Sequence, residues 1–66
     1  MRLTINGEPR ELAATDDLAA LIASLELDPR KIAIERNLEI VPRSLYAATP
    51  LADGDRIEIV HFIGGG

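Results

Sequence analysis

The sequence predicts an α+β fold, in which a mixed sheet of four to five strands carries one helix across one of its faces. Two segments near the ends of the chain, residues 2–6 and 56–62, alternate apolar and polar side chains with the period of a β-strand. Between them, residues 18–25 place apolar side chains at helical spacing. A sheet with one apolar face and a helix with one apolar stripe each need a partner, so we expect the two to pack together.

The first strand is predicted to return as a hairpin. Leu3 and Ile5 share one face of this strand. Asn6-Gly7 is a strong hairpin signal, because both central residues of a type I′ turn need a positive φ. Pro9 follows closely, and we therefore expect the return strand to begin around residues 10–12.

A helix is predicted to follow this hairpin. Thr15-Asp16-Asp17 is a good N-cap cluster that places acidic side chains in the first turn, where they complement the helix dipole. The apolar residues at positions i, i+3, i+4 and i+7 are Leu18, Leu21, Ile22 and Leu25. Asp28-Pro29 is expected to end the helix.

The middle of the chain predicts two more strands. Residues 32–36 alternate as a strand, residues 37–39 are expected to turn, and Ile40-Val41 to form a very short strand. Pro42 closes that strand because it has no amide hydrogen for a ladder. Residues 43–51 are expected to be an irregular connection with one 3₁₀ turn.

The last strand is expected to follow a tight turn at Asp53-Gly54-Asp55 and to run over residues 56–62. The first and last strands would then lie side by side and parallel at the centre of the sheet. The residues that would face the helix are Leu3, Ile5, Ile57 and Ile59. This is the β-grasp arrangement: we expect residues 1–63 to form a β-grasp domain and residues 64–66 to form a flexible glycine tail.

The composition argues against several classes of function. Seven Lys and Arg stand against eleven Asp and Glu, a formal net charge of −4, and the chain has one Tyr, one Phe and no Trp or Cys. Nucleic-acid binding, which uses basic stripes and aromatic stacking, is therefore not expected. No apolar run approaches the ~20 residues that cross a bilayer, and Met1-Arg2 leads into a strand pattern without a signal peptide. We expect a cytoplasmic chain with no membrane attachment that is a monomer when free.

The last three residues, Gly64, Gly65 and Gly66, follow the final strand pattern closely. Glycine has no Cβ and adopts positive φ freely, so such a tail can enter a narrow channel where larger residues would clash. The terminal carboxylate of Gly66 would be free to attack a nucleotide phosphate, and the resulting acyl carbon would be open to a nucleophile. Glycine-rich ends also occur as linkers or as remnants of expression vectors, and the tail by itself leaves these interpretations open.

Alternation in the last strand places Val60 and Phe62 on the face that points to solvent. Large exposed apolar side chains reduce solubility, so this pair, beside the tail, is a candidate docking spot for a partner protein. The alternative is that a neighbouring strand or loop covers one of them.

No other pattern indicates a reactive site. His61 is the single histidine, and without cysteines or clustered carboxylates it predicts a strand-edge residue and not a metal ligand. Ser44 lies beside a basic residue but has no histidine–aspartate pair. Asp53-Gly54-Asp55 lacks the distal glutamate of a calcium loop. We therefore expect no metal, no bound cofactor and no catalytic activity in this chain.

Taken together, these features resemble the ubiquitin-like sulfur carriers, and more specifically the ThiS family of bacterial thiamin biosynthesis. The resemblance spans the whole chain and rests on residues 1–8, 34–37, 39–43 and 51–66. Its most specific parts are Ile40-Val41-Pro42-Arg43 and the terminal segment. One departure is Leu38, where the family often has glycine, which leaves the type of that turn open.

The resemblance implies a carrier that other enzymes act on. A partner adenylating enzyme, which binds the ATP and Mg²⁺, would convert the Gly66 carboxylate into an acyl-adenylate. Sulfur from a persulfide donor would then turn Gly66 into a thiocarboxylate, and thiazole synthase would take that sulfur for the thiazole ring of thiamin. The expected partner-binding residues are Gly65, Gly64, Ile63, Phe62 and Val60.

Two alternatives stay open at this point. A sister carrier would use the same tail chemistry to supply sulfur to molybdopterin or to another acceptor. A non-catalytic β-grasp interaction domain would bind partners without any reaction at its terminus.

Overall fold

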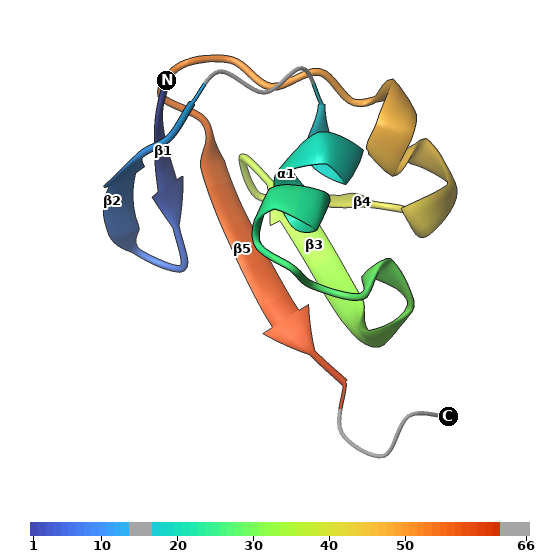
Figure 1. The fold of residues 1–66 in the computed structure, drawn as a ribbon. Coiled ribbons are helices and arrows are strands. Elements are labelled where there is room, and N and C mark those ends of the chain that lie inside the picture. Colours follow the sequence, from blue (N-terminus) through green and yellow to red (C-terminus); the bar gives the residue numbers. More distant parts are fainter. Residues whose placement is uncertain (14–16, 63–66) are drawn as a thin grey trace.

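The computed structural model describes residues 1–13 and 17–62, which form a five-stranded sheet with a short helix across one face (Figure 1). The strand order is β2-β1-β5-β3-β4. The strands are β1 (Arg2–Ile5), β2 (Glu8–Glu11), β3 (Ile32–Arg36), β4 (Glu39–Val41) and β5 (Arg56–His61). The helix is α1 (Leu18–Ser24), and the connections contain the 3₁₀ helices η1 (Pro29–Lys31) and η2 (Arg43–Ala48). The predicted α+β architecture is confirmed.

Parallel pairing of β1 with β5 forms the centre of the sheet, as predicted. The paired positions are Thr4↔Arg56 and Ile5↔Ile57, whereas β1–β2, β3–β4 and β3–β5 are antiparallel. Asn6 extends the contact beyond β1: its Nδ2 donates to the Ile59 carbonyl at 3.2 Å, and its Oδ1 accepts from the Ile59 amide at 2.7 Å. One side chain thus continues the ladder where the backbone turns away.

The core lies between this sheet and α1. The buried apolar residues are Leu3, Ile5, Leu18, Leu21, Ile22, Ile32, Ile34, Tyr46, Ile57 and Ile59. All four strand residues predicted to face the helix are among them. Burial of aliphatic side chains contributes about 1.5–3 kcal/mol each and is the main stabilising term of such a small domain. Tyr46 was not anticipated: the 3₁₀ turn expected after Pro42 is present as η2, and it turns this ring into the core.

The helix begins where the sequence predicts and ends earlier. Asp17 is the N-cap, and its side chain accepts from the Ala20 amide at 2.8 Å. Its carboxylate therefore lies at the cap and not in the first turn, where no acidic residue is found. The other two residues of the predicted cap cluster, Thr15 and Asp16, lie outside the described residues.

The prediction that Asp28-Pro29 ends the helix is wrong. The last helical residue is Ser24, and Glu26 adopts a left-handed conformation with φ of 59°. The Glu26 amide donates to the Ala23 carbonyl and the Leu27 amide to the Ile22 carbonyl, at 3.0 and 3.1 Å. These two hydrogen bonds form a Schellman cap, in which the left-handed residue is usually glycine. Because glutamate occupies that position here, the sequence did not predict the cap. Asp28 instead caps η1 by accepting from the Arg30 amide.

Several strand ends also differ from the prediction. β2 begins at Glu8, earlier than expected, so Pro9 lies inside a strand. β2 is an edge strand, where a residue without an amide hydrogen is tolerated. β1 ends at Ile5 and β5 ends at His61, each one residue earlier than predicted. Glu39 was expected in the turn, but it is the first residue of β4 and pairs with Arg36 of β3.

Both hairpins use two residues in the left-handed region. Asn6 and Gly7 have φ of 50° and 82°, which confirms the predicted type I′ geometry. Asn37 and Leu38 have φ of 50° and 71°, so the β3–β4 turn keeps the same conformation although leucine replaces the glycine that it favours. Leu38 is 74% exposed and gains little from burial. The backbone strain at this position is therefore not offset by packing.

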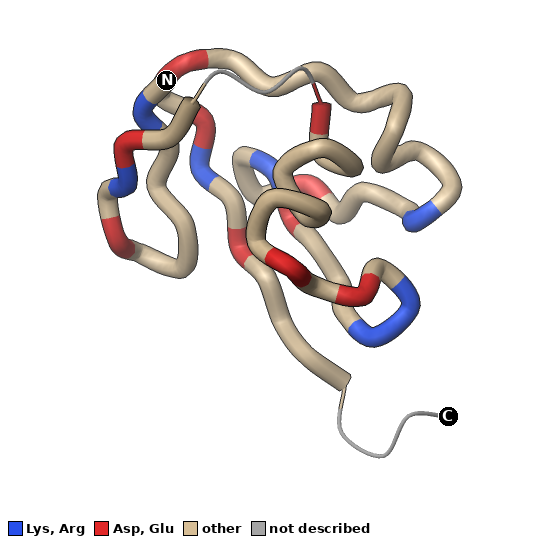
Figure 2. The backbone as a smooth tube through the Cα atoms, viewed as in Figure 1, with Lys and Arg blue, Asp and Glu red and all other residues tan. Residues whose placement is uncertain are grey.

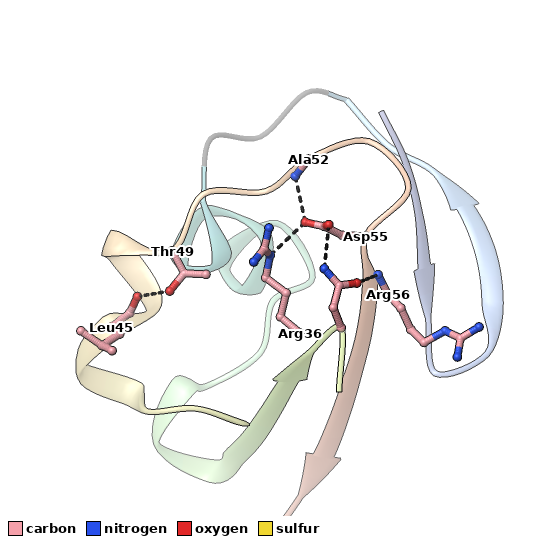
Figure 3. Close-up of polar contacts among 7 residues, drawn as sticks. Arg36, Leu45, Thr49, Ala52, Asp55 and Arg56 are labelled. Carbon is pink, nitrogen blue, oxygen red and sulfur yellow. Dashed lines mark hydrogen bonds and ion pairs between the residues drawn. The ribbon is translucent and has the colours of Figure 1, made fainter. Parts of the chain in front are cut away.

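Asp55 does more than complete a turn, because it is buried and links three segments (Figure 3). Its oxygens accept from the Ala52 amide at 2.9 Å, from Arg36 Nε at 3.0 Å and from Asn37 Nδ2 at 3.1 Å. Asn37 Oδ1 in turn accepts from the Arg56 amide at 2.9 Å. Burial by itself raises the pKa of Asp55, but these hydrogen bonds outweigh it and hold the pKa below the ordinary aspartate value.

We expect Leu38→Gly to stabilise the domain by about 0.5–1 kcal/mol, because glycine adopts positive φ without a Cβ clash. Urea denaturation of the purified chain measures the change. Leu38→Ala is the control, since it shortens the side chain and keeps the Cβ. Equal stability of the glycine and alanine variants would show that the turn is not strained.

We expect Asp55→Asn to destabilise the domain at neutral pH by about 1–3 kcal/mol, because the charged acceptor of a buried network is lost. A lowered pKa in the folded state means that the carboxylate stabilises the fold above the unfolded-state pKa, about 3.9, and that this contribution disappears as the pH falls through the folded-state value. Thermal melts across the acid range should therefore separate wild type from variant at neutral pH and bring them together in acid. A constant difference across that range contradicts the assignment.

Candidate functional site

Exposed apolar residues at and beyond the end of β5 lie on the sheet face opposite α1. Val60 is 59% exposed on β5 and Phe62, just beyond β5, is 56% exposed. Both predicted docking residues are thus open to solvent, and among residues 1–13 and 17–62 no strand or loop covers either of them. The alternative considered from the sequence, a covering element, is not found in this part of the chain.

Register adds two residues to this surface. Val60 pairs with Ala33 on β3, and Ile40 on β4 pairs with Glu35. Ala33, Ile40 and Val60 line one shallow hollow, and Ala33, Ile40 and Phe62 line a neighbouring one. We call Ala33, Ile40, Val60 and Phe62 the outer patch.

Ile40 is 78% exposed, and sequence reasoning did not identify it as a site residue. In a strand of two or three residues, alternation cannot assign a face until the pairing is known. The structure sets Glu35 opposite Ile40 through a two-residue turn at Asn37-Leu38, whereas the three-residue turn expected over residues 37–39 would have set Arg36 opposite Ile40. Only the two-residue turn places Ile40 on the same face as Ala33 and Glu35.

The described chain leaves the sheet beside the outer patch. The Phe62 amide donates to the Lys31 carbonyl at 2.9 Å, which holds the residue after β5 against the end of η1. Basic residues are found on η1 at this end of the molecule (Figure 2). Arg30 is paired with Asp28 at 3.0 Å. Ile63, Gly64, Gly65 and Gly66 lie outside the described residues, so their expected roles stay predictions.

The other candidates named from the sequence do not form a reactive site within the described residues. His61 is exposed and is the last residue of β5, in agreement with the interpretation that it lies at the edge of a strand. Ser44 lies in η2 at an apolar groove of about 290 Å³ between η2 and α1. Over residues 1–13 and 17–62 no three His, Cys, Asp or Glu side chains are grouped to hold a metal. Burial raises the pKa of Tyr46, which keeps this phenol neutral.

Comparison with known proteins shows what this fold and surface are similar to. A family model described as the ThiS family matches residues 3–66. The sulfur carrier protein ThiS of Bacillus subtilis is 44% identical over 52 residues, which cover 79% of each chain. The chain belongs to the ThiS family. The curated member of this family from Bacillus subtilis is named a sulfur carrier protein.

A solved structure agrees with this family assignment. The crystal structure of the thiamine biosynthesis protein ThiS from Geobacter metallireducens superimposes with a TM-score of 0.85 at 32% identity, over the whole of both chains. The ubiquitin-like β-grasp fold expected from the sequence is thereby confirmed. Across the described segments of this ThiS family member, no helix is long and apolar enough to span a membrane.

Longer relatives also contain a region like this chain. A protein named thiazole synthase from Paramagnetospirillum magneticum is 56% identical over 66 residues, and another from Magnetococcus marinus is 46% identical over 66 residues. The match takes in all of this ThiS family chain and 20% of each of those proteins. The chain thus spans about one fifth of the length of these two curated relatives.

Proposed function

We propose that this chain carries sulfur as a thiocarboxylate on Gly66 and delivers it for thiazole formation in thiamin synthesis. The observation that carries the proposal is the match to the ThiS sulfur carriers, which extends through residue 66. The sequence contains no cysteine, so a side-chain persulfide on this chain is not available as the carrier. An acyl carbon at the end of the chain can hold sulfur instead.

The chemistry requires a partner that binds ATP and Mg²⁺. The Gly66 carboxylate attacks the α-phosphate, pyrophosphate leaves, and an acyl-adenylate forms. A persulfide from the sulfur donor displaces AMP, and a thiol then cleaves the resulting acyl disulfide to leave the thiocarboxylate. Formation of the adenylate activates a carboxylate that is otherwise a poor electrophile.

The outer patch is proposed as the docking surface for the partner enzymes, with Ile63, Gly64 and Gly65 leading Gly66 into the active site of the partner. Four residues beyond Phe62 span at most about 14 Å when fully extended. The body of the domain must therefore dock close to the entrance of that site. Exposed apolar side chains beside the last described residue, Phe62, support this arrangement.

Thiazole synthase is the proposed acceptor of the sulfur. The two relatives named thiazole synthase, each with a region like this chain in a fifth of its length, support this choice. Joining of two functions in one polypeptide keeps them at a high effective concentration, as expected for partners that act in sequence.

Intact-mass measurement tests the carrier chemistry. After incubation with the adenylating enzyme, ATP and a sulfide source, the chain should become heavier by the difference between one sulfur and one oxygen atom. Deletion of Gly66 should abolish the gain, because the reacting carboxylate then sits one residue short of the partner's nucleotide. An unchanged wild-type mass would favour a non-catalytic interaction domain.

Growth of a deletion strain identifies the acceptor. Loss of the chain should make growth depend on added thiamin, and wild-type protein supplied in trans should restore growth without it. A strain that grows normally without thiamin and instead lacks molybdopterin would assign the sulfur to the other acceptor.

We expect Val60→Asp to abolish this partner-dependent gain of mass while leaving the domain folded. An exposed strand position changes stability by about 1 kcal/mol at most, whereas a charge placed inside an apolar contact opposes docking. Leu45→Asp is the matched control, since Leu45 is also an exposed apolar residue but lies on η2. Normal activation of the Val60 variant, with urea denaturation confirming its fold, would remove the outer patch from the mechanism.

A further inference from the structure

Two glutamates face each other across the centre of the outer sheet face. Glu35 on β3 and Glu58 on β5 are direct register partners in an antiparallel pair. Both side chains are half-buried. Directly opposed like charges destabilise a sheet, and partial burial weakens the screening of their repulsion by water. The register therefore sets two like charges opposite each other at the centre of the outer sheet face.

Within the described residues, neither glutamate of this pair forms an ion pair. The ion pairs within residues 1–13 and 17–62 join Arg30 to Asp28 and Arg36 to Asp55. Arg36 follows Glu35 directly and turns to the opposite side, into the Asp55 network. Arg56 shares the outer face with Glu58, yet its side chain extends away from β3 toward the side of β1 (Figure 3).

The surroundings of the two carboxylates have the shape and chemistry of a receptor. A shallow hollow of about 110 Å³ lies over them, and its lining residues are Ala33, Ile34, Glu35, Ile40, Glu58 and Val60. The two carboxylates thus sit within the apolar outer patch. An arginine side chain matches both parts, because its methylene stem packs on apolar surface and its planar guanidinium donates to two carboxylates at once.

We propose that Glu35 and Glu58 form a receptor for an arginine of the partner protein that docks on the outer patch, and that this partner is thiazole synthase. The inference rests on the proposed function for the identity of the partner, and on the two opposed carboxylates within an apolar hollow for the chemistry of the contact. A partner that inserts a guanidinium removes the repulsion and gains two charge-assisted hydrogen bonds. A neutral or acidic surface leaves the repulsion in place, so the pair selects among proteins that offer an apolar face.

Glu58→Lys separates this role from a structural one. In the free chain the introduced ammonium group would pair with Glu35 directly across the strands, so the melting temperature should rise. The same substitution should weaken binding to thiazole synthase at least tenfold. The introduced lysine would occupy the receptor, and its positive charge would repel the arginine of the partner. Glu8→Lys, on edge strand β2, makes the same change of charge and should alter affinity by less than about twofold.

Binding is measured by titration calorimetry of the full chain with purified thiazole synthase, and stability by thermal melts of the chain alone. Glu35→Gln and Glu58→Gln should each weaken binding about threefold or more, reduce its salt dependence and leave the melting temperature unchanged or higher. Wild-type affinity in these variants, or a lower melting temperature for Glu58→Lys, would overturn the proposal.

Two further outcomes would also overturn it. Stabilisation of wild type by Ca²⁺ or Mg²⁺ that disappears in the two glutamine variants would assign the carboxylates to a metal ion. Absence of any binding of the wild-type chain to thiazole synthase would remove the partner. The carrier chemistry is judged separately, by the gain of sulfur on the wild-type chain, so failure of one proposal is distinguishable from failure of the other.

Discussion

The parallel contact between β1 and β5 is the constraint on which the rest of the structure depends. It joins the two ends of the described chain through two register pairs and the side chain of Asn6, which bonds both backbone groups of Ile59. This contact places β5 at the centre of the sheet. Ile57 and Ile59 then face the helix, Glu58 and Val60 face outward, and the chain leaves the sheet beside exposed apolar side chains.

The two ends of β5 are held in different ways. At its start, the buried carboxylate of Asp55 gathers hydrogen bonds from the Ala52 amide, Arg36 and Asn37, so the strand begins at a defined position relative to the β3–β4 turn. At its end, one backbone hydrogen bond from Phe62 to Lys31 continues the pairing. These hydrogen bonds fix the start of β5 in the register that opposes Glu35 to Glu58. One strand, β5, thus contributes buried core residues on one face and one of the two opposed glutamates on the other.

Much of this arrangement was predictable because its signals are local or periodic. Alternation identified the strands and their buried faces, and Asn6-Gly7 identified a turn whose residues both need positive φ. The failures share one cause. The helix end at Glu26 uses a left-handed glutamate held by local backbone hydrogen bonds, and Pro9 lies in an edge strand that tolerates a missing amide hydrogen. In both cases the surrounding structure outweighs the preference of a single residue. Within the candidate site, Val60 and Phe62 followed from alternation, whereas Ile40 required the pairing of a strand too short to show a period.

The sequence by itself determined the order of the elements, the apolar stripes that form the core and the family to which the chain belongs. These depend on residues a few positions apart, whose spacing is set by the geometry of a helix or a strand. Only the tertiary structure decided which side chains meet: Asp55 with Arg36, and Glu35 with Glu58. These partners lie far apart in the chain. Strand register sets Glu35 opposite Glu58, and a shift of one residue would remove that pairing, whereas Asp55 meets Arg36 from the turn before β5.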